Sequence, residues 1–172
     1  MDSIQIVNTT AEDWEMVVWL FEQALQLQGK KGYMVWSGID LEALKGEMDK
    51  KLQYKIIKDQ QVVCLFSARE NDPLIWGERD RGDAVYLHRI VVHPDLKGQR
   101  LFEIVLDWAI QSARQHGFKY VRMDTWAENN KIIEYYKGFG FSVVENYRTN
   151  DAAELPLQNR NLNVALLEKH IG

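Results

Sequence analysis

The chain has 172 residues, which is enough for one domain with a substantial core, and no shift in composition divides residues 1–172. Its 46% hydrophobic and 27% charged residues are ordinary for a soluble globular protein, and the net charge of −4 argues against nucleic acid as the main partner while permitting a cationic or amine ligand. A single cysteine, Cys64, excludes an internal disulfide, and the N-terminal residues lack the basic and apolar segments of a signal peptide. Because no apolar run approaches the length of a membrane span either, we expect a cytoplasmic protein with no membrane partner.

The first half of the chain predicts a strand, two helices and a hairpin. Alternating apolar residues indicate a strand over residues 4–7, and apolar residues at helical spacing indicate a helix over about residues 10–28. A more polar helix is expected over about residues 40–51. Two further strands, over residues 53–58 and 61–70, are separated by so few residues that they form a hairpin.

Two loops of this half carry tryptophans. Residues 33–38 form an unusually apolar connection, in which Trp36 either plugs the edge of the core or lines a substrate site. Residues 71–83 combine proline and glycine with mixed charges, which indicates a surface loop. Trp76 in that loop either faces a ligand or is packed down, and Trp36, Trp76 and Trp126 are the candidate substrate-lining residues.

The second half is organised around a strand, a turn and a helix. Residues 84–92 are rich in β-branched and aromatic residues, residues 93–102 contain a proline and a glycine, and residues 103–116 have the apolar stripe of a helix packed on a sheet. The first backbone N–H groups of such a helix are unpaired and lie at the positive end of the helix dipole. The junction is therefore suited to binding an anion, above all a phosphate.

A short helix and three strands complete the predicted fold. They are a strand over residues 120–125, a helix over residues 129–137, and strands over residues 141–149 and 161–169. One right-handed β-α-β crossover passes through the helix after the turn, and the other strand pairs are compatible with antiparallel order. We therefore expect an α/β fold of the α+β kind, with a mixed, mostly antiparallel central sheet flanked by helices.

Two segments of this half resemble one known family. Residues 92–102 read VHPDLKGQRLF and are similar to the acetyl-CoA loop of the GNAT superfamily of N-acetyltransferases, V-x-P-x-x-[RQ]-G-x-G-x-[GA]. Lys97 takes the Arg/Gln place and Gly98 matches, whereas Arg100 and Phe102 stand where the family has glycine and a second small residue. A second segment, NNKIIEYYKGFGF, resembles the family pattern N-x-x-a-x-x-x-Y-x-x-x-G-F, with four residues in register: Asn129, Tyr136, Gly140 and Phe141.

The resemblance implies a GNAT-like fold and acetyl-CoA as co-substrate. Main-chain N–H groups of the loop would hold the pyrophosphate, and the end of the preceding strand would pair with the pantetheine arm like an added strand edge. Asn129 would hold the cofactor or cap the short helix. The implied cofactor-binding residues are Ile90, Val91, Val92, Lys97, Gly98, Gln99, Arg100, Leu101, Phe102 and Asn129.

Acetyl transfer to an amine needs a neutral amine, a stabilised oxyanion and a proton for the departing thiolate. By resemblance Tyr136 is the general acid, and a phenol is a fitting proton donor to a thiolate; the alternative is a packing tyrosine. His88 lies four residues before Val92, and alternation places it on the same strand face as Tyr86 and Ile90. It is the candidate base because imidazole accepts a proton near neutrality. The alternatives are a structural histidine and an amine that arrives already neutral.

The remaining features narrow the interpretation. The four histidines are scattered and no His or Cys pair has ligand spacing, so no metal is expected. No G-x-G-x-x-G follows a predicted strand, which argues against a Rossmann nucleotide-binding protein. We expect the acceptor to be a primary amine of a small molecule or peptide, and a homodimer is an open option. The alternative function is a non-catalytic acyl-CoA-binding or regulatory module on the same fold, suggested by Arg100 and Phe102.

Overall fold

The computed structural model describes residues 3–30, 40–96, 100–155 and 160–172. The chain forms two compact units, of which the first comprises Met1–Ala68 and Arg89–Val105 and the second Arg69–His88 and Leu106–Gly172. Each unit is built from two segments that are distant in the sequence. The expectation of a single domain over residues 1–172 stays a prediction.

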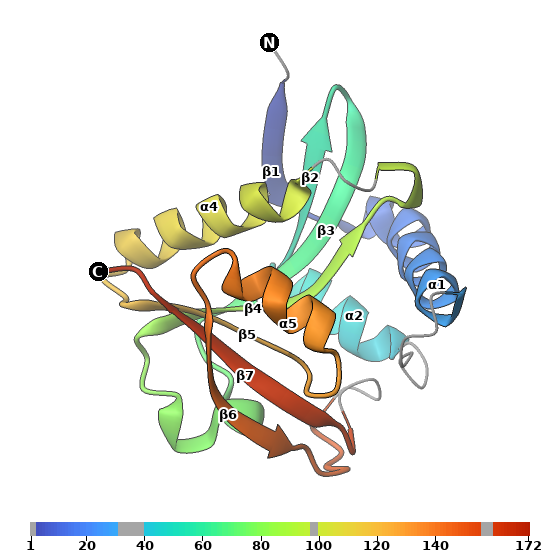
Figure 1. The fold of residues 1–172 in the computed structure, drawn as a ribbon. Helices are drawn as coiled ribbons and strands as arrows, with labels where there is room; N and C mark the ends of the chain where they lie inside the picture. The colour runs from blue at the N-terminus through green and yellow to red at the C-terminus, as the bar shows by residue number, and fades with distance from the viewer. Residues whose placement is uncertain (1–2, 31–39, 97–99, 156–159) are drawn as a thin grey trace. The chain divides into compact units, whose positions relative to one another are not determined.

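Seven strands form one mixed sheet in the order β1-β2-β3-β4-β5-β7-β6 (Figure 1). β4 and β5 are parallel and joined by α4, whereas the pairs β1/β2, β2/β3, β5/β7 and β6/β7 are antiparallel. The predicted α+β fold, with a mostly antiparallel sheet and one β-α-β crossover, is therefore confirmed. The elements are β1 (Ile4–Asn8), η1 (Ala11–Asp13), α1 (Trp14–Lys30), α2 (Leu41–Asp49), β2 (Gln53–Lys58), β3 (Gln61–Arg69), α3 (Pro73–Trp76), η2 (Gly77–Arg79), β4 (Ala84–Val92), η3 (Pro94–Leu96), α4 (Leu101–Gln115), β5 (Tyr120–Trp126), α5 (Asn130–Lys137), β6 (Ser142–Arg148) and β7 (Asn163–His170).

The first unit has a core that joins α1 and α2 to β3 and the end of β4. The 3-10 helix η1, which precedes α1, is capped by Asp13: the Thr10 N–H donates to Asp13 Oδ2 at 2.8 Å, and Lys55 Nζ lies 2.9 Å from the same oxygen. Such a cap satisfies backbone donors that the first helical turn leaves unpaired. The core cluster behind it is apolar throughout: Val17, Leu20, Phe21, Leu44, Met48, Leu65 and Val91.

The hairpin of β2 and β3 is closed by the predicted tight turn. Lys58 is the register partner of Gln61, and the two residues between them, Asp59 and Gln60, have φ of 50° and 67°. Positive φ at both central positions is the requirement of a type I′ turn, whose twist matches that of the strands. The turn is therefore set by the strand pairing, because neither residue is a glycine.

The second unit corrects one expectation about the loop over residues 71–83. The segment contains the short helix α3, and its Ile75 and Trp76 belong to a buried cluster with Tyr86, Val164 and Leu166. It is therefore not merely a surface loop. The helix has only four residues, with proline at its first position, so it is too short for a helical period to appear in the sequence.

α4 has the amphipathic pattern that the sequence predicts. Asp107, Gln111 and Arg114 are exposed, whereas Val105 and Ala109 are fully buried. The helix begins at Leu101, two residues before the expected start. Within the described residues, no helix combines the length and the apolar character that crossing a membrane would require.

Candidate active site

His88 lies between two buried carboxylates of the second unit. The parallel register of β4 and β5 ends with Tyr86 opposite Arg122, and His88 and Asp124 each lie two residues beyond this last pair. The distance from His88 Nδ1 to Asp124 Oδ1 is 3.6 Å, and Asp72, just before α3, brings its Oδ2 to 2.8 Å from His88 Nε2. The side chains of Asp72, His88 and Asp124 are only 9%, 8% and 8% exposed, so water screens these charges poorly.

The same three side chains have donor atoms of the kind that divalent ions bind. One nitrogen or oxygen from each lies within 4.8 Å of the others. The two ring nitrogens of His88 each face a different carboxylate. The geometry is thus that of an imidazole bridging two aspartates, and the expectation of no metal stays a prediction.

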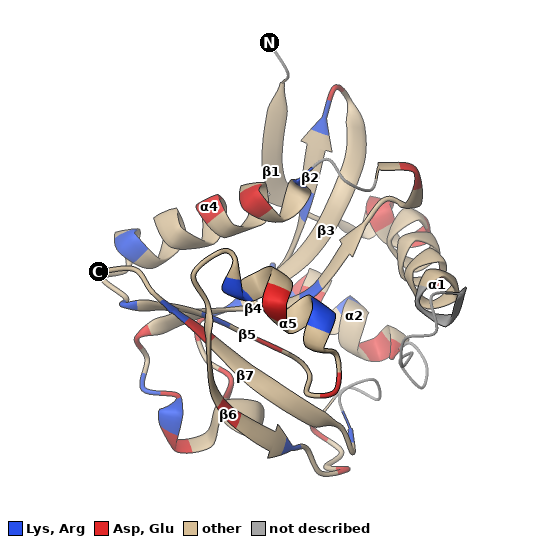
Figure 2. Ribbon diagram, in the orientation of Figure 1, with Lys and Arg blue, Asp and Glu red and all other residues tan. Residues whose placement is uncertain are grey.

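A hydrogen-bonded network holds Asp72 in place. The Asp72 N–H donates to Asp80 Oδ2 at 3.0 Å, and the Tyr86 hydroxyl donates to Asp80 Oδ1 at 3.0 Å. Arg122 Nη1 in turn donates to the Tyr86 hydroxyl at 2.9 Å. Burial raises the pKa of Tyr86 well above its ordinary value, so its hydroxyl keeps its proton. Figure 2 shows the charged residues gathered along the segment between α3 and β4, which carries Asp80.

Arg122 is the centre of this network. Its Nε donates to Glu168 Oε2 at 2.8 Å, and its Nη2 lies 2.8 Å from the same oxygen. Its Nη1 donates to the Arg79 carbonyl at 2.8 Å. The guanidinium carbon also lies 4.8 Å from the ring centres of both Trp76 and Tyr120. A buried cation with this many partners fixes the positions of the strands and of the α3 segment around it.

The tyrosine of the second motif lies on α5, the short predicted helix. Asn129 caps the helix, because its Oδ1 accepts a hydrogen bond from the Ile132 N–H at 3.1 Å. The Tyr136 side chain is half-buried, and its ring meets that of Phe141 edge-on at 6.2 Å. The cap and the edge contact hold Tyr136 on a defined face of a capped helix.

Gly140 explains why the motif ends in Gly-Phe. Its φ is +94°, and a Cβ atom at this position would lie 2.5 Å from Lys169 Nζ. Glycine adopts such a φ without steric cost. The chain thereby turns directly into Phe141, which is buried.

The loop before α4 departs from its family motif at two described residues. Lys97, Gly98 and Gln99 lie outside the described residues. Arg100 has a φ of 55°, the left-handed conformation for which glycine is usual, and its exposed side chain pairs with Glu103. Phe102 is buried, as is Leu101. The two residues that suggested a non-catalytic module are thus accommodated, one by its backbone conformation and the other in the core.

β4 contains an irregular residue immediately after His88. Arg89 has a φ of 49°, and its Nε lies 2.6 Å from Glu47 Oε1, with both side chains buried. A left-handed residue interrupts the two-residue alternation of a strand. Tyr86 and His88 do belong to one network. Arg89, however, lies between His88 and Ile90, so alternation along the strand does not establish that His88 and Ile90 share a face. Val91 is buried in the first unit's core, and Ile90 and Val92 are partly buried.

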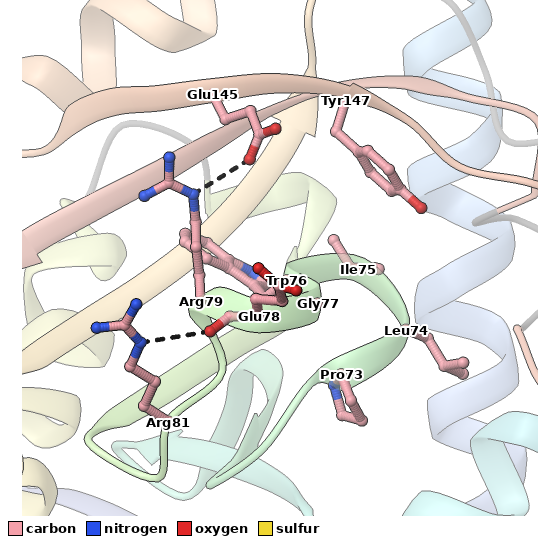
Figure 3. Close-up of a pocket in the computed structure, with 10 residues that line it drawn as sticks. All are labelled: Pro73, Leu74, Ile75, Trp76, Gly77, Glu78, Arg79, Arg81, Glu145 and Tyr147. Atoms are coloured by element: carbon pink, nitrogen blue, oxygen red, sulfur yellow. Dashed lines mark hydrogen bonds and ion pairs between the residues drawn. The ribbon is translucent and has the colours of Figure 1, made fainter.

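A pocket of about 510 Å³ lies between the α3–η2 segment and β6 (Figure 3). Arg79 reaches across it to Glu145, with 3.1 Å between Nε and Oε2. Trp76 contributes to the wall although it is only 2% exposed, and its Nε1 has no hydrogen-bond acceptor among the described residues. Of the other predicted substrate residues, Trp126 is partly buried at the end of β5 and Trp36 lies outside the described residues. The pocket residues are Pro73, Leu74, Ile75, Trp76, Gly77, Glu78, Arg79, Arg81, Glu145 and Tyr147.

Comparison with known proteins identifies the family. The family model described as "Acetyltransferase (GNAT) family" matches residues 17–141, well over half of the chain. The chain belongs to the GNAT family. The Bacillus subtilis (strain 168) relative YesJ, described as an uncharacterized N-acetyltransferase, is 26% identical over 141 residues, which are 77% of this chain and 78% of YesJ. The prediction of a GNAT N-acetyltransferase is therefore confirmed.

Solved GNAT structures share the fold across the whole chain. A GNAT-family acetyltransferase from Listeria monocytogenes 4b F2365 has a TM-score of 0.79 at 15% identity, covering 97% of this chain and 94% of its own. The putative acetyltransferase yncA from Salmonella typhimurium, solved with its cofactor acetyl-CoA, has a TM-score of 0.66 at 15% identity, covering 99% and 95%. At such identities the likeness establishes the fold alone.

Two residues of the cluster around His88, Asp72 and Asp124, were not predicted from the sequence. Neither belongs to a motif, and both come together with His88 only through the β4/β5 pairing and the position of α3. A weak signal did exist, because an aspartate before a proline is a common helix start. No sequence pattern tells a capping aspartate from one that faces a histidine.

Proposed function

We propose that the protein transfers the acetyl group of acetyl-CoA to a primary amine of a small molecule or peptide. The observation that carries the proposal is the family match, whose residues 17–141 include the loop at the start of α4, His88 and Tyr136. The yncA structure, solved with acetyl-CoA, supports the choice of co-substrate.

Acetyl-CoA would be held mainly by backbone groups of this chain. Main-chain N–H groups over residues 97–102 would meet the pyrophosphate at the start of α4, where the left-handed Arg100 takes the place of the family's glycine. The backbone of Ile90, Val91 and Val92 would pair with the amides of the pantetheine arm. Asn129 would add a side-chain contact, since capping α5 through its oxygen leaves its amide hydrogens available to a ligand.

The reaction would need one base and one acid from the second unit. Acetyl-CoA supplies the thioester. As the amine nitrogen forms its bond to the carbonyl carbon and the carbon–sulfur bond breaks, His88 would take the amine's proton and the Tyr136 hydroxyl would donate a proton to the thiolate sulfur. The products are an amide and free CoA, and one proton must pass from His88 to Tyr136 through solvent before the next cycle.

The acceptor would bind on the side of the α3 segment. Asp72, next to the first residue of the pocket wall, faces His88, and the wall includes Trp76, Arg79 and Tyr147. Trp76, Trp36 and Trp126 are proposed to line the acceptor site.

Calorimetry with acetyl-CoA and a thiol-release assay over a panel of primary amines test the proposal. We expect binding of acetyl-CoA in the absence of an acceptor, and release of CoA only when an amine is present. Binding without release across small-molecule and peptide amines would favour the non-catalytic module, and absence of binding would refute the co-substrate.

A further inference from the structure

We infer that Asp72 is a positioning residue that fixes the tautomer of His88, and that Asp124 stabilises the protonated ring. The inference rests on the proposed function for its catalytic consequence. Its structural part depends only on the three side chains of the second unit.

The contact with Asp72 determines which ring nitrogen carries hydrogen. Asp72 Oδ2 lies 2.8 Å from His88 Nε2, within ion-pair distance. Two lone pairs at this distance would repel, and an ionised carboxylate has no hydrogen to place between them. The hydrogen is therefore on Nε2, and the neutral ring carries its lone pair on Nδ1.

The other nitrogen has the surroundings that a base requires. Nδ1 lies 3.6 Å from Asp124 Oδ1, which is longer than a hydrogen bond yet close enough for a charge to act. A proton arriving at Nδ1 makes the ring a cation next to this carboxylate. Nearby opposite charge favours the protonated form, so Asp124 stabilises what His88 becomes when it accepts the amine's proton.

The proton on Nε2 stays where it is throughout the step. Asp72 orients the ring, while the amine's proton moves to Nδ1 and later leaves to solvent. Asp72 itself is held by Asp80, which accepts from its N–H at 3.0 Å. Among the described residues, this network includes Asp72 before α3, Asp124 on β5 and Asp80, with Tyr86 and Arg122 one contact further away.

The matched variants are Asp72→Asn, Asp124→Asn and Asp80→Asn. Asp80→Asn removes a charge from the same network, but Asp80 does not contact the imidazole. This variant therefore shows how far a disturbed network alone changes the rate. The rate of CoA release is measured against pH for each variant, with two amines of different pKa. We expect Asp72→Asn and Asp124→Asn to lower turnover by roughly 10-fold or more and to move the acid limb of the profile to lower pH, because loss of a carboxylate disfavours the cationic ring. Asp80→Asn should leave the limb unmoved with either amine.

A second measurement needs no activity. Long-range ¹⁵N NMR of the imidazole in the unaltered protein should show the Nε2–H form of the neutral ring, and Asp72→Asn should lose that preference. A neutral ring with hydrogen on Nδ1, or a limb that moves equally in Asp72→Asn and Asp80→Asn, overturns the inference. Because the NMR result does not depend on turnover, a failure of the proposed function alone would leave the Nε2–H tautomer in place.

Discussion

Replacing Arg122 by methionine should be among the most damaging single changes in the second unit. The side chain is 6% exposed, and its Nε and Nη2 both lie 2.8 Å from Glu168 Oε2, besides its bonds to Tyr86 and the Arg79 carbonyl. Removing one partner of a buried ion pair costs about 3–5 kcal/mol, because the other charge stays behind without compensation. Glu168 is 19% exposed and recovers some hydration, so we expect the loss in free energy of unfolding to lie at the lower end of this range, roughly 3 kcal/mol. For a chain of this length, that corresponds to a fall in Tm of roughly 6–12 °C.

Urea unfolding followed by circular dichroism and tryptophan fluorescence measures this change. Arg148→Met is the matched control, because Arg148 is exposed and makes a single side-chain bond to Asn163 at 3.2 Å. Its cost should stay below about 1 kcal/mol, as for other exposed polar contacts. If Arg122→Met is no less stable than Arg148→Met, the network around Arg122 contributes nothing net, and the account of how α3 is anchored is wrong.

Three further predictions concern single side chains. Tyr136→Phe should lower turnover by roughly 10²-fold or more with nearly unchanged acetyl-CoA affinity, and an unaltered rate with a good acceptor would leave Tyr136 a packing residue. Gly140→Ala should cost at least about 1–2 kcal/mol in urea unfolding, since alanine is strained at a φ of +94° and its Cβ displaces Lys169, whereas Gly46→Ala in the interior of α2 should stabilise by up to about 1 kcal/mol. Burial raises the pKa of Cys64 from 9.0 to about 12, so its thiol should react with a disulfide reagent at pH 8 only after unfolding. The contribution of the buried neutral thiol to the free energy of unfolding should be complete below pH 9 and lost between pH 9 and 12. Rapid labelling of the native protein would contradict the burial of Cys64.

The sequence predicts features that repeat along the chain or that need a special residue. The stripe of α4 extends over four turns, and its exposed and buried residues lie where the 3.6-residue period places them. The Gly140-Phe141 pair was found through its family pattern, and few residues other than glycine adopt the backbone conformation that Gly140 has. Both signals are local, so the tertiary structure was not needed to read them.

Features that depend on tertiary contacts were not readable. Asp72 and Asp124 meet His88 because two strands pair in parallel and a four-residue helix packs nearby, and neither event leaves a period in the sequence. Arg100 shows the converse problem. By residue type Arg100 does not match the loop motif, yet its φ of 55° is a conformation that the glycine of the motif readily adopts. Residue type constrains φ only statistically, and a favourable context can hold an arginine there.

The two outer strands of the sheet differ in how they would meet other chains. β6 exposes Glu145 and Arg148, and its register shifts between Val143 and Glu145, so its edge is both charged and irregular. β1 pairs with β2 in unbroken register and leaves Ile4 and Val7 44% and 43% exposed. A regular, apolar outer strand is a template on which identical chains can add strands. Self-association of the chain should therefore begin at β1. The substitution Val7→Lys would place a charge on β1 and oppose it, as Glu145 and Arg148 do on β6.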